Sequence, residues 1–320
     1  MRILVTGGAG FIGSNFVRHV IETTSHDVVT LDRLTYAGDI DNLDGVLSHP
    51  RHEFVEGDIR DESLVGDLLR DADAVVNFAA ESHVDRSIAD AEEFVSVNVE
   101  GTRTLLDAAL AADLGLFLQV STDEVYGQVI EGESAEGDEL SPRNPYAATK
   151  AAADHLASSY YTTHDLPVVI TRSSNNFGPR QHTEKLVPKF ITRAAKGERL
   201  PLYGDGTQVR EWLFVRDNCR AIATVLRDGT PGEIYNVGSE YDLRNVEVAK
   251  RIVSEVGASE DLIEFVSDRP GHDQRYALST EKVRSLGWSP NWTFREGLRE
   301  TVDYYLDSRL TSREVDASDD

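Results

Sequence analysis

Short apolar runs alternate with helix-patterned segments over the first half of the chain. Six runs have the length and composition of buried strands: residues 2–7, 28–32, 52–58, 74–80, 116–121 and 167–174. Between them, apolar residues recur at helical spacing over residues 11–23, 62–71, 92–113 and 144–164. Strands that alternate with helices in this way form parallel sheets covered on both faces. The pattern therefore predicts an α/β fold built on a doubly wound parallel sheet.

The pattern becomes irregular after about residue 178. Loops rich in glycine, proline and charge separate helical segments near residues 186–196, 217–227, 245–256 and 294–307. We expect residues 1–178 to form the sheet domain, and residues 179–310 to form a smaller mixed α/β lobe, partly interleaved with it. The polar residues 311–320 are expected to form a frayed tail.

Composition narrows the class of protein. The chain is 40% hydrophobic and 28% charged, which is ordinary for a globular protein in water. Its single cysteine, Cys219, excludes an internal disulfide and a cysteine metal cluster, so a reducing compartment is expected and no metal site is predicted. The N-terminus leads directly into a strand, and no apolar run reaches membrane-spanning length. We therefore expect a cytoplasmic protein.

The net charge of −24 bears on partners and on working conditions. It argues against nucleic acid or an anionic membrane, because either would be repelled. The acid is dispersed along the chain, and there are only six lysines, of which Lys150 is the first. We hypothesise a protein adapted to concentrated salt, where self-repulsion is screened. Activity and melting temperature that ignored salt between dilute buffer and molar KCl would refute this hypothesis.

A glycine-rich loop follows the first predicted strand and opens the first predicted helix. Gly7, Gly10 and Gly13 allow a tight turn, close approach of a pyrophosphate to the backbone, and helix–strand packing. Asp32 ends the second strand at the spacing of an acid that binds the adenosine ribose. Together they predict a Rossmann-like domain that binds NAD, since Asp32 would repel the 2′-phosphate of NADP. The neighbouring Arg33 leaves this preference open.

Asp58 and Ile59, after the third strand, are a second candidate contact on the adenosine side. An ordinary turn aspartate explains these residues equally well.

Tyr146 and Lys150 are four residues apart, so they lie one above the other on a helix face. A nearby ammonium favours the phenolate, and we expect it to lower the pKa of Tyr146 and make it a base for a hydroxyl proton. The alternative is an ordinary helix pair on the surface. The scarcity of lysine in this chain favours catalysis, because arginine would serve for surface charge.

Thr122, Asp123 and Glu124 come directly after an apolar strand. Adjacent carboxylates repel each other and resist desolvation. Either the strand meets water here, or the protein uses two acids at this edge of its sheet.

These features resemble the extended short-chain dehydrogenase/reductases that act on nucleotide sugars. The glycine loop, Asp32 and the Tyr146–Lys150 pair carry the broad resemblance. Several segments, which together stretch to about residue 277, resemble the dTDP-glucose 4,6-dehydratase family more narrowly: LTYAGDIDNL, AAESHVDRSI, STDEVYG, SSNNFGP, EKLVP, LPLYGDGTQVREWLFV and DRPGHDQRYA. Related 4-epimerases usually have small residues in place of Thr-Asp-Glu, so the acid pair is the discriminating feature.

The resemblance implies a three-step reaction on dTDP-glucose. Tyr146 takes the proton of the sugar 4-hydroxyl while NAD accepts hydride from carbon 4. Glu124 then removes the hydrogen on carbon 5, Asp123 protonates the departing hydroxyl of carbon 6, and Thr122 polarises the 4-oxygen. Hydride returns to carbon 6, so the cofactor stays bound. Elimination needs two carboxyl groups in opposite protonation states, and close apposition helps to create them.

The resemblance also assigns binding residues. On the cofactor side it implies Gly7, Gly10, Phe11, Ile12, Gly13, Asp32, Arg33, Leu34, Thr35, Asp58, Ile59, Ala79, Ala80, Glu81, Ser82, Tyr146, Lys150 and Asn176. On the substrate side it implies His83, Thr122, Asn175, Lys185, Leu186, Pro201, Leu202, Tyr203, Arg210, Asn245, Asp268, Arg269, Pro270, Gly271 and His272. A core histidine at position 83 and an asparagine turn at 175–176 stay open as alternatives. The resemblance further implies a homodimer built on helices within 92–113 and 144–164.

Some features depart from the family or leave room for another function. Arg180 follows the SSNNFGP segment, so local contacts there are expected to differ. The acidic residues 128–140 suit a solvated loop or a mobile cover. A UDP- or CDP-sugar dehydratase, or a 4-epimerase, is the main alternative. A catalytically silent nucleotide sensor or scaffold is disfavoured, because it has no use for Tyr146, Lys150, Asp123 and Glu124 together.

Overall fold

The computed structural model describes residues 1–269 and 271–307. Its largest element is a seven-stranded sheet in the order β10-β6-β5-β4-β1-β2-β3, in which every pair of neighbours is parallel. The strands are β1 (Arg2–Thr6), β2 (Asp27–Asp32), β3 (His52–Glu56), β4 (Ala74–Asn77), β5 (Leu116–Thr122), β6 (Val168–Ser173) and β10 (Ile234–Val237). The predicted doubly wound α/β fold is confirmed.

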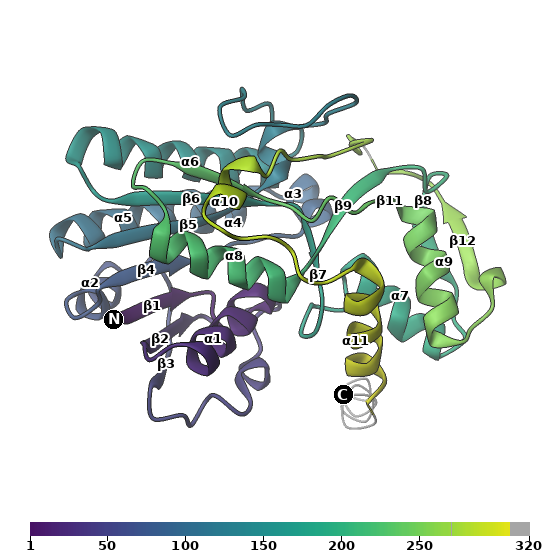
Figure 1. Cartoon of the computed structure of the whole chain (residues 1–320), viewed down its shortest axis with the longest axis horizontal. Helices are drawn as coiled ribbons and strands as arrows, with labels where there is room; N and C mark the ends of the chain where they lie inside the picture. Colours follow the sequence, from purple (N-terminus) through teal and green to yellow (C-terminus); the bar gives the residue numbers. More distant parts are fainter. Residues whose placement is uncertain (270, 308–320) are drawn as a thin grey trace.

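Helices cover both faces of this sheet (Figure 1). The helices α1 (Phe11–Thr23) and α8 (Val215–Asp228) pack together on one face. On the other lie α2 (Glu62–Leu69), α5 (Thr102–Ala111) and α6 (Pro145–His164). Alternate residues of a strand point to opposite faces, so Ile3 and Val5 join the α1–α8 core, whereas Leu4 joins the core under α2 and α5.

The predicted helix over residues 92–113 is interrupted. It consists of α4 (Glu92–Val95), a π-helical segment (Ser96–Gly101) and α5. Asn98 lies in the π segment, where its amide accepts from the backbone N–H of Glu81 (2.8 Å) and donates to the Glu81 carbonyl (3.0 Å). The same amide donates to Thr149 of α6 (3.0 Å). The widened turn thus ties a loop at the strand ends to α6, in keeping with the frequent occurrence of π segments at functional sites.

A second lobe, at the right of Figure 1, contains two small sheets. One has the order β11-β9-β7, formed by β7 (Asn175–Phe177), β9 (Val209–Phe214) and β11 (Asp242–Arg244). The other pairs β8 (Leu200–Tyr203) with β12 (Ile263–Val266). The helices α7 (Leu186–Ala195), α9 (Asn245–Val256) and α11 (Phe294–Leu306) pack around them. Their shared core includes Phe177, Phe190, Trp212 and Leu298.

The chain passes between the two lobes more than once. After β7 and β9 of the second lobe, α8 and β10 return to the large sheet, where β10 pairs with β6. The short helix α10 (Glu281–Ser285) also packs beside β10, whereas α3 (Val84–Ala89) packs against α6. The strands beyond residue 174 were not predicted, because most of them contain proline, asparagine or charged residues instead of a continuous apolar run.

The acidic loop 128–140 is anchored at its centre. Ser134 is buried, its N–H donates to the Ala277 carbonyl (2.9 Å), and its carbonyl accepts from the Asn236 amide (3.0 Å). The Arg275 guanidinium donates to the Gly132 carbonyl (2.7 Å). The loop lines neither of the two cavities described below.

No helix in the described ranges is long and apolar enough to cross a membrane.

Candidate active site

Two adjoining cavities lie at the carboxyl ends of the parallel strands. The first, of about 240 Å³, opens over β1, β2 and β4, where the strand order reverses. The second, of about 550 Å³, lies between the large sheet and the second lobe. Open α/β sheets bind ligands at such a reversal. The residues that line both cavities are Phe11, Ile12, Ser82, Val120, Ser121, Tyr146, Gln181, Glu184 and Lys185.

The glycine loop forms the floor of the first cavity. Gly7 has a φ of 68°, and a Cβ atom on it would lie 2.6 Å from the Ala79 nitrogen. A Cβ on Gly13 would lie 2.2 Å from the Gly7 carbonyl oxygen. Gly10 is the N-cap of α1 and supplies no side chain to the first turn. The loop therefore leaves backbone N–H groups at a helix N-terminus facing the cavity, the arrangement that suits a phosphate.

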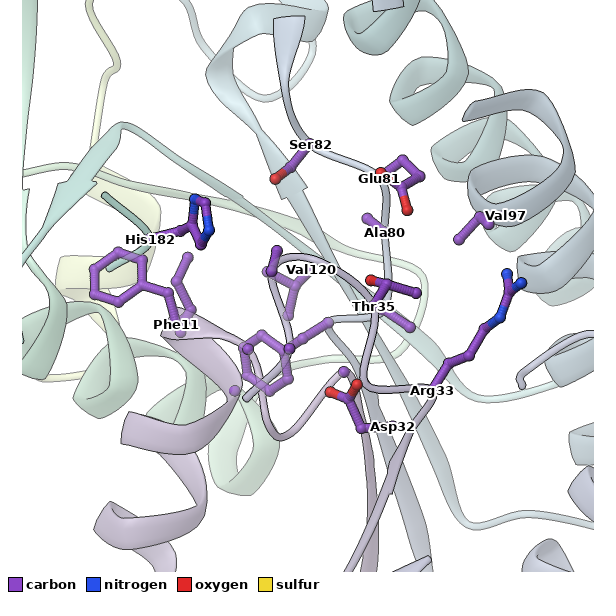
Figure 2. Close-up of a pocket in the computed structure, with 18 of the residues that line it drawn as sticks. Phe11, Asp32, Arg33, Thr35, Ala80, Glu81, Ser82, Val97, Val120 and His182 are labelled. Atoms are coloured by element: carbon purple, nitrogen blue, oxygen red, sulfur yellow. The ribbon is translucent and has the colours of Figure 1, made fainter. Parts of the chain in front are cut away.

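Asp32 and Arg33 lie beside Thr35 at one side of this cavity, with Phe11 and His182 at the other (Figure 2). The buried Asp32 carboxylate accepts from the backbone N–H groups of Ala9 and Leu34, both at 2.9 Å. Burial raises the pKa of Asp32, and these N–H donors oppose the rise.

Arg33 is held by carboxylates. Its guanidinium pairs with Asp58 (3.3 Å) and Glu93 (2.9 Å), and Arg60 pairs with the same two acids. The Arg60 guanidinium lowers the pKa of Asp58 against the opposing effect of burial. Because two acids neutralise the charge of Arg33, the neighbour of Asp32 is not an uncommitted site for a 2′-phosphate.

Most of the residues expected on the cofactor side line the first cavity. Two do not. Leu34, with a φ of 53°, packs against the core under α1 and α8. Asn176 lines the second cavity instead, and its amide donates to the Ser174 carbonyl (2.9 Å). Lining residues that the sequence reasoning missed include Gly38, Gly57, Val97, Gln181, His182 and Glu184. Of these, only Gly38 and Glu184 belong to segments that carried the resemblance.

The acid pair lies where β5 ends, and all three residues of the Thr-Asp-Glu run line the second cavity. A short 3₁₀ turn (Asp123–Tyr126) follows, and the Thr122 hydroxyl caps it by accepting from the Glu124 N–H (3.3 Å). The same hydroxyl donates to Asp123 Oδ1 (3.1 Å). The Asn144 amide donates to Glu124 Oε2 (3.0 Å).

The two acids have different surroundings. Asp123 is only 3% exposed, and its Oδ2 has no hydrogen-bond partner among the described residues. Burial, followed by the charges of Glu124 and Glu211, raises the pKa of Asp123 well above its usual range. Glu124 is half-buried and lies on the cavity wall. The site therefore favours a protonated Asp123 beside a more accessible Glu124.

Tyr146 and Lys150 both lie on α6 and line the first cavity, and Tyr146 reaches the second as well. The expected lowering of the tyrosine pKa is wrong for the protein alone. Burial and the charges of Glu124 and Asp123 raise the pKa of Tyr146, while a hydrogen bond with Thr122 opposes them. Lys150 does not offset this rise, because its ammonium donates to the Val120 carbonyl (2.7 Å) and burial lowers its own pKa to about 8.

The second cavity gathers residues that are far apart in sequence. Of the residues expected on the substrate side, it is lined by His83, Thr122, Asn175, Lys185, Leu186, Pro201, Leu202, Tyr203, Arg210, Asn245, Arg269 and His272. Asp268 and Gly271 are not on its wall, and Pro270 lies outside the described residues. Further lining residues, not expected from the sequence, include Asp85, Ser174, Lys189, Phe190 and Trp212.

Arg210 projects from β9 and is 5% exposed. Its guanidinium donates to the carbonyls of Val209 and Asp273, both at 2.8 Å, and stacks on the Tyr276 ring at 4.5 Å. Within the described residues, no carboxylate lies within ion-pair distance of it. A buried cation on a cavity wall, held by neutral groups alone, suits an anionic ligand.

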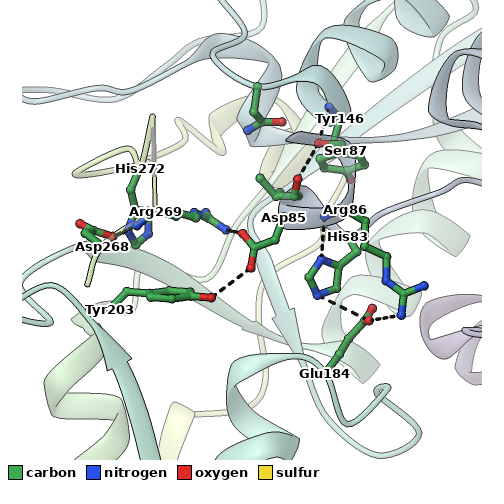
Figure 3. A network of polar contacts seen from close by, with 12 residues as sticks. His83, Asp85, Arg86, Ser87, Tyr146, Glu184, Tyr203, Asp268, Arg269 and His272 are labelled. Atoms are coloured by element: carbon green, nitrogen blue, oxygen red, sulfur yellow. Dashed lines mark hydrogen bonds and ion pairs between the residues drawn. The ribbon is translucent and has the colours of Figure 1, made fainter. Parts of the chain in front are cut away.

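Polar contacts bridge the two lobes beside this cavity (Figure 3). Asp85 of α3 pairs with Arg269 and accepts from the Tyr203 hydroxyl, both at 3.2 Å. Asp268 does not reach the cavity because its carboxylate contacts His272 (2.6 Å). On the other side, Glu184 lies near His83 (3.5 Å) and Arg86 (3.4 Å).

Many buried polar atoms on the wall of the second cavity have no protein partner within the described ranges. They belong to Ser121, Asp123, Ser174, Asn175, Asn176, Gln181, Glu184, Trp212 and Asn245. Unpaired buried donors and acceptors are costly. Their concentration on one wall indicates a ligand rich in hydroxyl, carbonyl or phosphate oxygens.

A family model for GDP-mannose 4,6 dehydratase matches residues 4–301 of the chain. The chain belongs to this dehydratase family. Within the dehydratases, a dTDP-glucose 4,6-dehydratase from Streptomyces niveus is 50% identical over 315 residues, which cover 97% of this chain and 94% of the relative. The low-salt glycan biosynthesis protein Agl12 of Haloferax volcanii is 64% identical over 306 residues, covering 96% and 99%.

The solved dehydratase DesIV of Streptomyces venezuelae, described as a dTDP-glucose 4,6-dehydratase with NAD and thymidine diphosphate bound, has the same fold. Its TM-score is 0.95 at 50% identity, over 97% of this chain and 98% of that one. The resemblance to the extended dehydrogenase/reductases, and to the dTDP-glucose 4,6-dehydratases among them, is confirmed.

Proposed function

We propose that this protein is an NAD-dependent dTDP-glucose 4,6-dehydratase, which converts dTDP-glucose into dTDP-4-keto-6-deoxyglucose. One observation carries the proposal: the wall shared by the two cavities holds Tyr146, and Asp123 and Glu124 line the second cavity beside it. A 4-epimerase needs the tyrosine and the cofactor, but it has no elimination step that would use two acids. The similarity to the dehydratases of Streptomyces niveus and Streptomyces venezuelae supports the same activity.

The first cavity fits NAD. Gly7 and Gly13 allow the tight turn, because a Cβ atom on either would clash with the backbone of Ala79 or of Gly7. The loop and the N-terminus of α1 line the cavity. Asp32 would hold the adenosine ribose through hydrogen bonds to its hydroxyls, and the ion pairs of Arg33 favour NAD over NADP. When bound, NAD supplies the acceptor for the hydride of carbon 4 and returns that hydride to carbon 6.

Tyr146 serves as the base for the proton of the 4-hydroxyl. Its high pKa in the protein alone comes first from burial and then from two nearby carboxyl groups. Protonation of Asp123 removes one of these negative charges and so makes the phenolate less costly. The positive charge of Lys150, one helical turn away, favours the phenolate when its side chain leaves the Val120 carbonyl.

The acid pair performs the elimination. Asp123 is buried and favours the protonated form, so it is the acid that protonates the departing 6-hydroxyl. Glu124, oriented by the Asn144 amide, is the base for the hydrogen on carbon 5. Thr122 donates to Asp123 in the protein alone, and it would turn towards the 4-oxygen of the sugar.

The second lobe binds the nucleotide in this proposal. Arg210 contacts the diphosphate, because it is a buried cation without a carboxylate partner among the described residues. Asn175, Asn245 and the β8 residues Pro201–Tyr203 bind the rest of the nucleotide.

The decisive experiment incubates the purified protein with dTDP-glucose, UDP-glucose or CDP-glucose, without added NAD, and follows the products by mass spectrometry. Loss of one water from dTDP-glucose is the expected result. An isobaric galactose product would replace the proposal with a 4-epimerase, and preferential turnover of UDP- or CDP-glucose would change the nucleotide. Tyr146→Phe should abolish every product, since no step follows without oxidation at carbon 4.

The assembly, location and working conditions extend the proposal. We infer a cytoplasmic homodimer that forms through α5 and α6, which pack side by side. Leu110 and Tyr161 on these helices are 37% and 39% exposed. Light scattering should give twice the chain mass, and Leu110→Glu should shift the protein towards the monomer.

We also infer that the protein works in concentrated salt, in line with its net charge of −24 and its similarity to a Haloferax relative. Raising KCl from dilute buffer to the molar range should increase both Tm and activity, because it screens self-repulsion. No dependence on salt would refute this inference.

A further inference from the structure

Three of the chain's six lysines line the two cavities: Lys150, Lys185 and Lys189. In a chain that otherwise prefers arginine, this concentration is unexpected for solvated surface charge. Lys150 and Lys185 were expected from the sequence. Lys189 follows the EKLVP segment and had no expected role.

Lys185 and Lys189 are four residues apart at the start of α7, so they lie on the same side of the helix. Lys185 is the N-cap of the helix and lines both cavities, and its ammonium donates to the Ser82 carbonyl (2.9 Å). Lys189 is one turn further along and lines only the second cavity. The rise of an α-helix places it about 6 Å further along the axis, away from the shared wall. Lys189 is thus absent from the shared wall, where Tyr146 lies.

In the part of the chain that the structure describes, the charge of Lys189 has no counterion. The described residues place no carboxylate within 4.0 Å of its ammonium and no hydrogen-bond acceptor against it, although the side chain is half-buried. Arg269, which lines the same cavity, is paired with Asp85 (3.2 Å). Arg210 is held by carbonyl groups alone. Among the described residues, Lys185, Lys189 and Arg210 are thus three cations of one cavity without an ion-pair partner, in a chain of net charge −24. Of the three, Lys189 alone has no hydrogen-bond acceptor there either.

We propose that Lys189 is a second cationic contact for the diphosphate of the nucleotide, in addition to Arg210. A lysine ammonium donates in three directions and accepts nothing, so its partners are phosphate or carbonyl oxygens. Its absence from the wall that holds Tyr146 separates it from the reacting sugar, and its place in the same cavity as Arg210 puts it with another cation. Its positive charge favours the anionic phosphates over the neutral base. This inference rests on the proposed function, which supplies the diphosphate.

The test compares thymidine diphosphate with thymidine, by calorimetric titration of the NAD-loaded protein at one KCl concentration. Lys189→Leu should weaken binding of thymidine diphosphate about tenfold, as expected for one hydrogen bond to a charged group. It should leave thymidine binding within about twofold of wild type. Lys189→Arg should restore most of the affinity for the diphosphate.

A matched control is Lys250→Leu, which removes the same charge outside both cavities. Lys250 lies on α9, and its exposed side chain pairs with Glu260. It should leave both affinities unchanged. If Lys189→Leu does not fold, Lys189→Met provides the same charge removal on an unbranched chain.

In turnover of dTDP-glucose, Lys189→Leu should raise KM and leave kcat within about twofold, the result of losing uniform binding. Unchanged affinity for thymidine diphosphate would overturn the proposal. An equal loss for thymidine would overturn it as well, because it would move the contact to the base. A wild-type protein that binds no thymidine diphosphate would refute the proposed function together with this inference.

Discussion

The two cavities differ in how their polar groups are satisfied. Around the first, Asp32 accepts two backbone N–H groups, and Arg33 is paired with Asp58 and Glu93. The wall that belongs to the second cavity alone contains buried polar atoms without partners, from Asp123, Ser174, Asn175, Asn176, Trp212 and Asn245. None of the residues that line only the first cavity has such an atom in the described ranges.

This difference is expected if, as proposed, the first cavity binds the cofactor and the second binds the substrate. A cofactor that stays bound through every turnover needs a rigid cradle, and a self-satisfied wall keeps its shape. A substrate that enters and leaves must supply the missing hydrogen bonds itself, so its binding site leaves them open. The two acids lie on the unsatisfied side, where burial raises the pKa of one of them.

The largest loss of activity is expected from a substitution in the second cavity. Glu124→Gln should reduce formation of the 4-keto-6-deoxy product by about 10²–10⁴, because elimination loses its base. Oxidation at carbon 4 should persist, so reduced nicotinamide should accumulate in a single turnover, as measured by its absorbance. Glu133→Gln, on the exposed acidic loop, is the charge-matched control. Full dehydration by Glu124→Gln would assign the base elsewhere.

Arg210→Met should weaken substrate binding by roughly 10- to 100-fold, since a buried cation that meets the diphosphate is lost. The NAD content of the purified protein should not change, because Arg210 lines only the second cavity. Measuring KM together with the amount of bound NAD separates an effect on substrate binding from an effect on cofactor binding. Loss of NAD in this variant would contradict the separation of the two cavities.

Asp32→Asn should weaken NAD binding about tenfold and spare the nucleotide-sugar side. The uncharged amide also removes the repulsion of a 2′-phosphate, so the preference for NAD over NADP should narrow. Both affinities can be measured by fluorescence titration of protein stripped of cofactor. An unchanged preference would show that the ion pairs of Arg33, rather than Asp32, set it.

The smallest expected effect concerns stability. Burial lowers the pKa of Lys150 to about 8 from 10.5, so between these values the unfolded chain binds a proton that the folded chain lacks. Stability from this group therefore rises as pH increases through that window. Lys150→Met should raise Tm by roughly 2–4 °C near neutral pH. The difference in Tm between the variant and the wild type should become smaller towards about pH 10. A constant difference in thermal melts would show that folding does not lower the pKa of Lys150.

Part of the candidate site could be predicted from the sequence because it is local. The glycine loop, Asp32 and the helix that holds Tyr146 and Lys150 each depend on a few neighbouring residues whose conformation follows from their own chemistry. Asp123 and Glu124 stood out for the same reason, as charges at the end of an apolar strand. The six strands of the first half were visible because buried parallel strands are continuous apolar runs.

Long-range contacts were beyond the sequence pattern. The strands of the second lobe are short, and the seventh strand of the large sheet, β10, pairs with β6 from some sixty residues away. The interruption at Ser96–Gly101 depends on Asn98 meeting Glu81 and Thr149, contacts that no helical periodicity encodes.

The sequence by itself determined six strands of the large sheet, the cofactor loop and the candidates for the reacting groups, because local chemistry and periodicity decide these. Only the tertiary structure decided their electrostatics and the walls of the second cavity. It turned Lys150 towards the Val120 carbonyl, raised the pKa of Asp123 by burying it near Glu211, and placed Lys189 on the cavity wall with Arg210. Desolvation and the distance between charges depend on packing in three dimensions, and neither can be read from residue order.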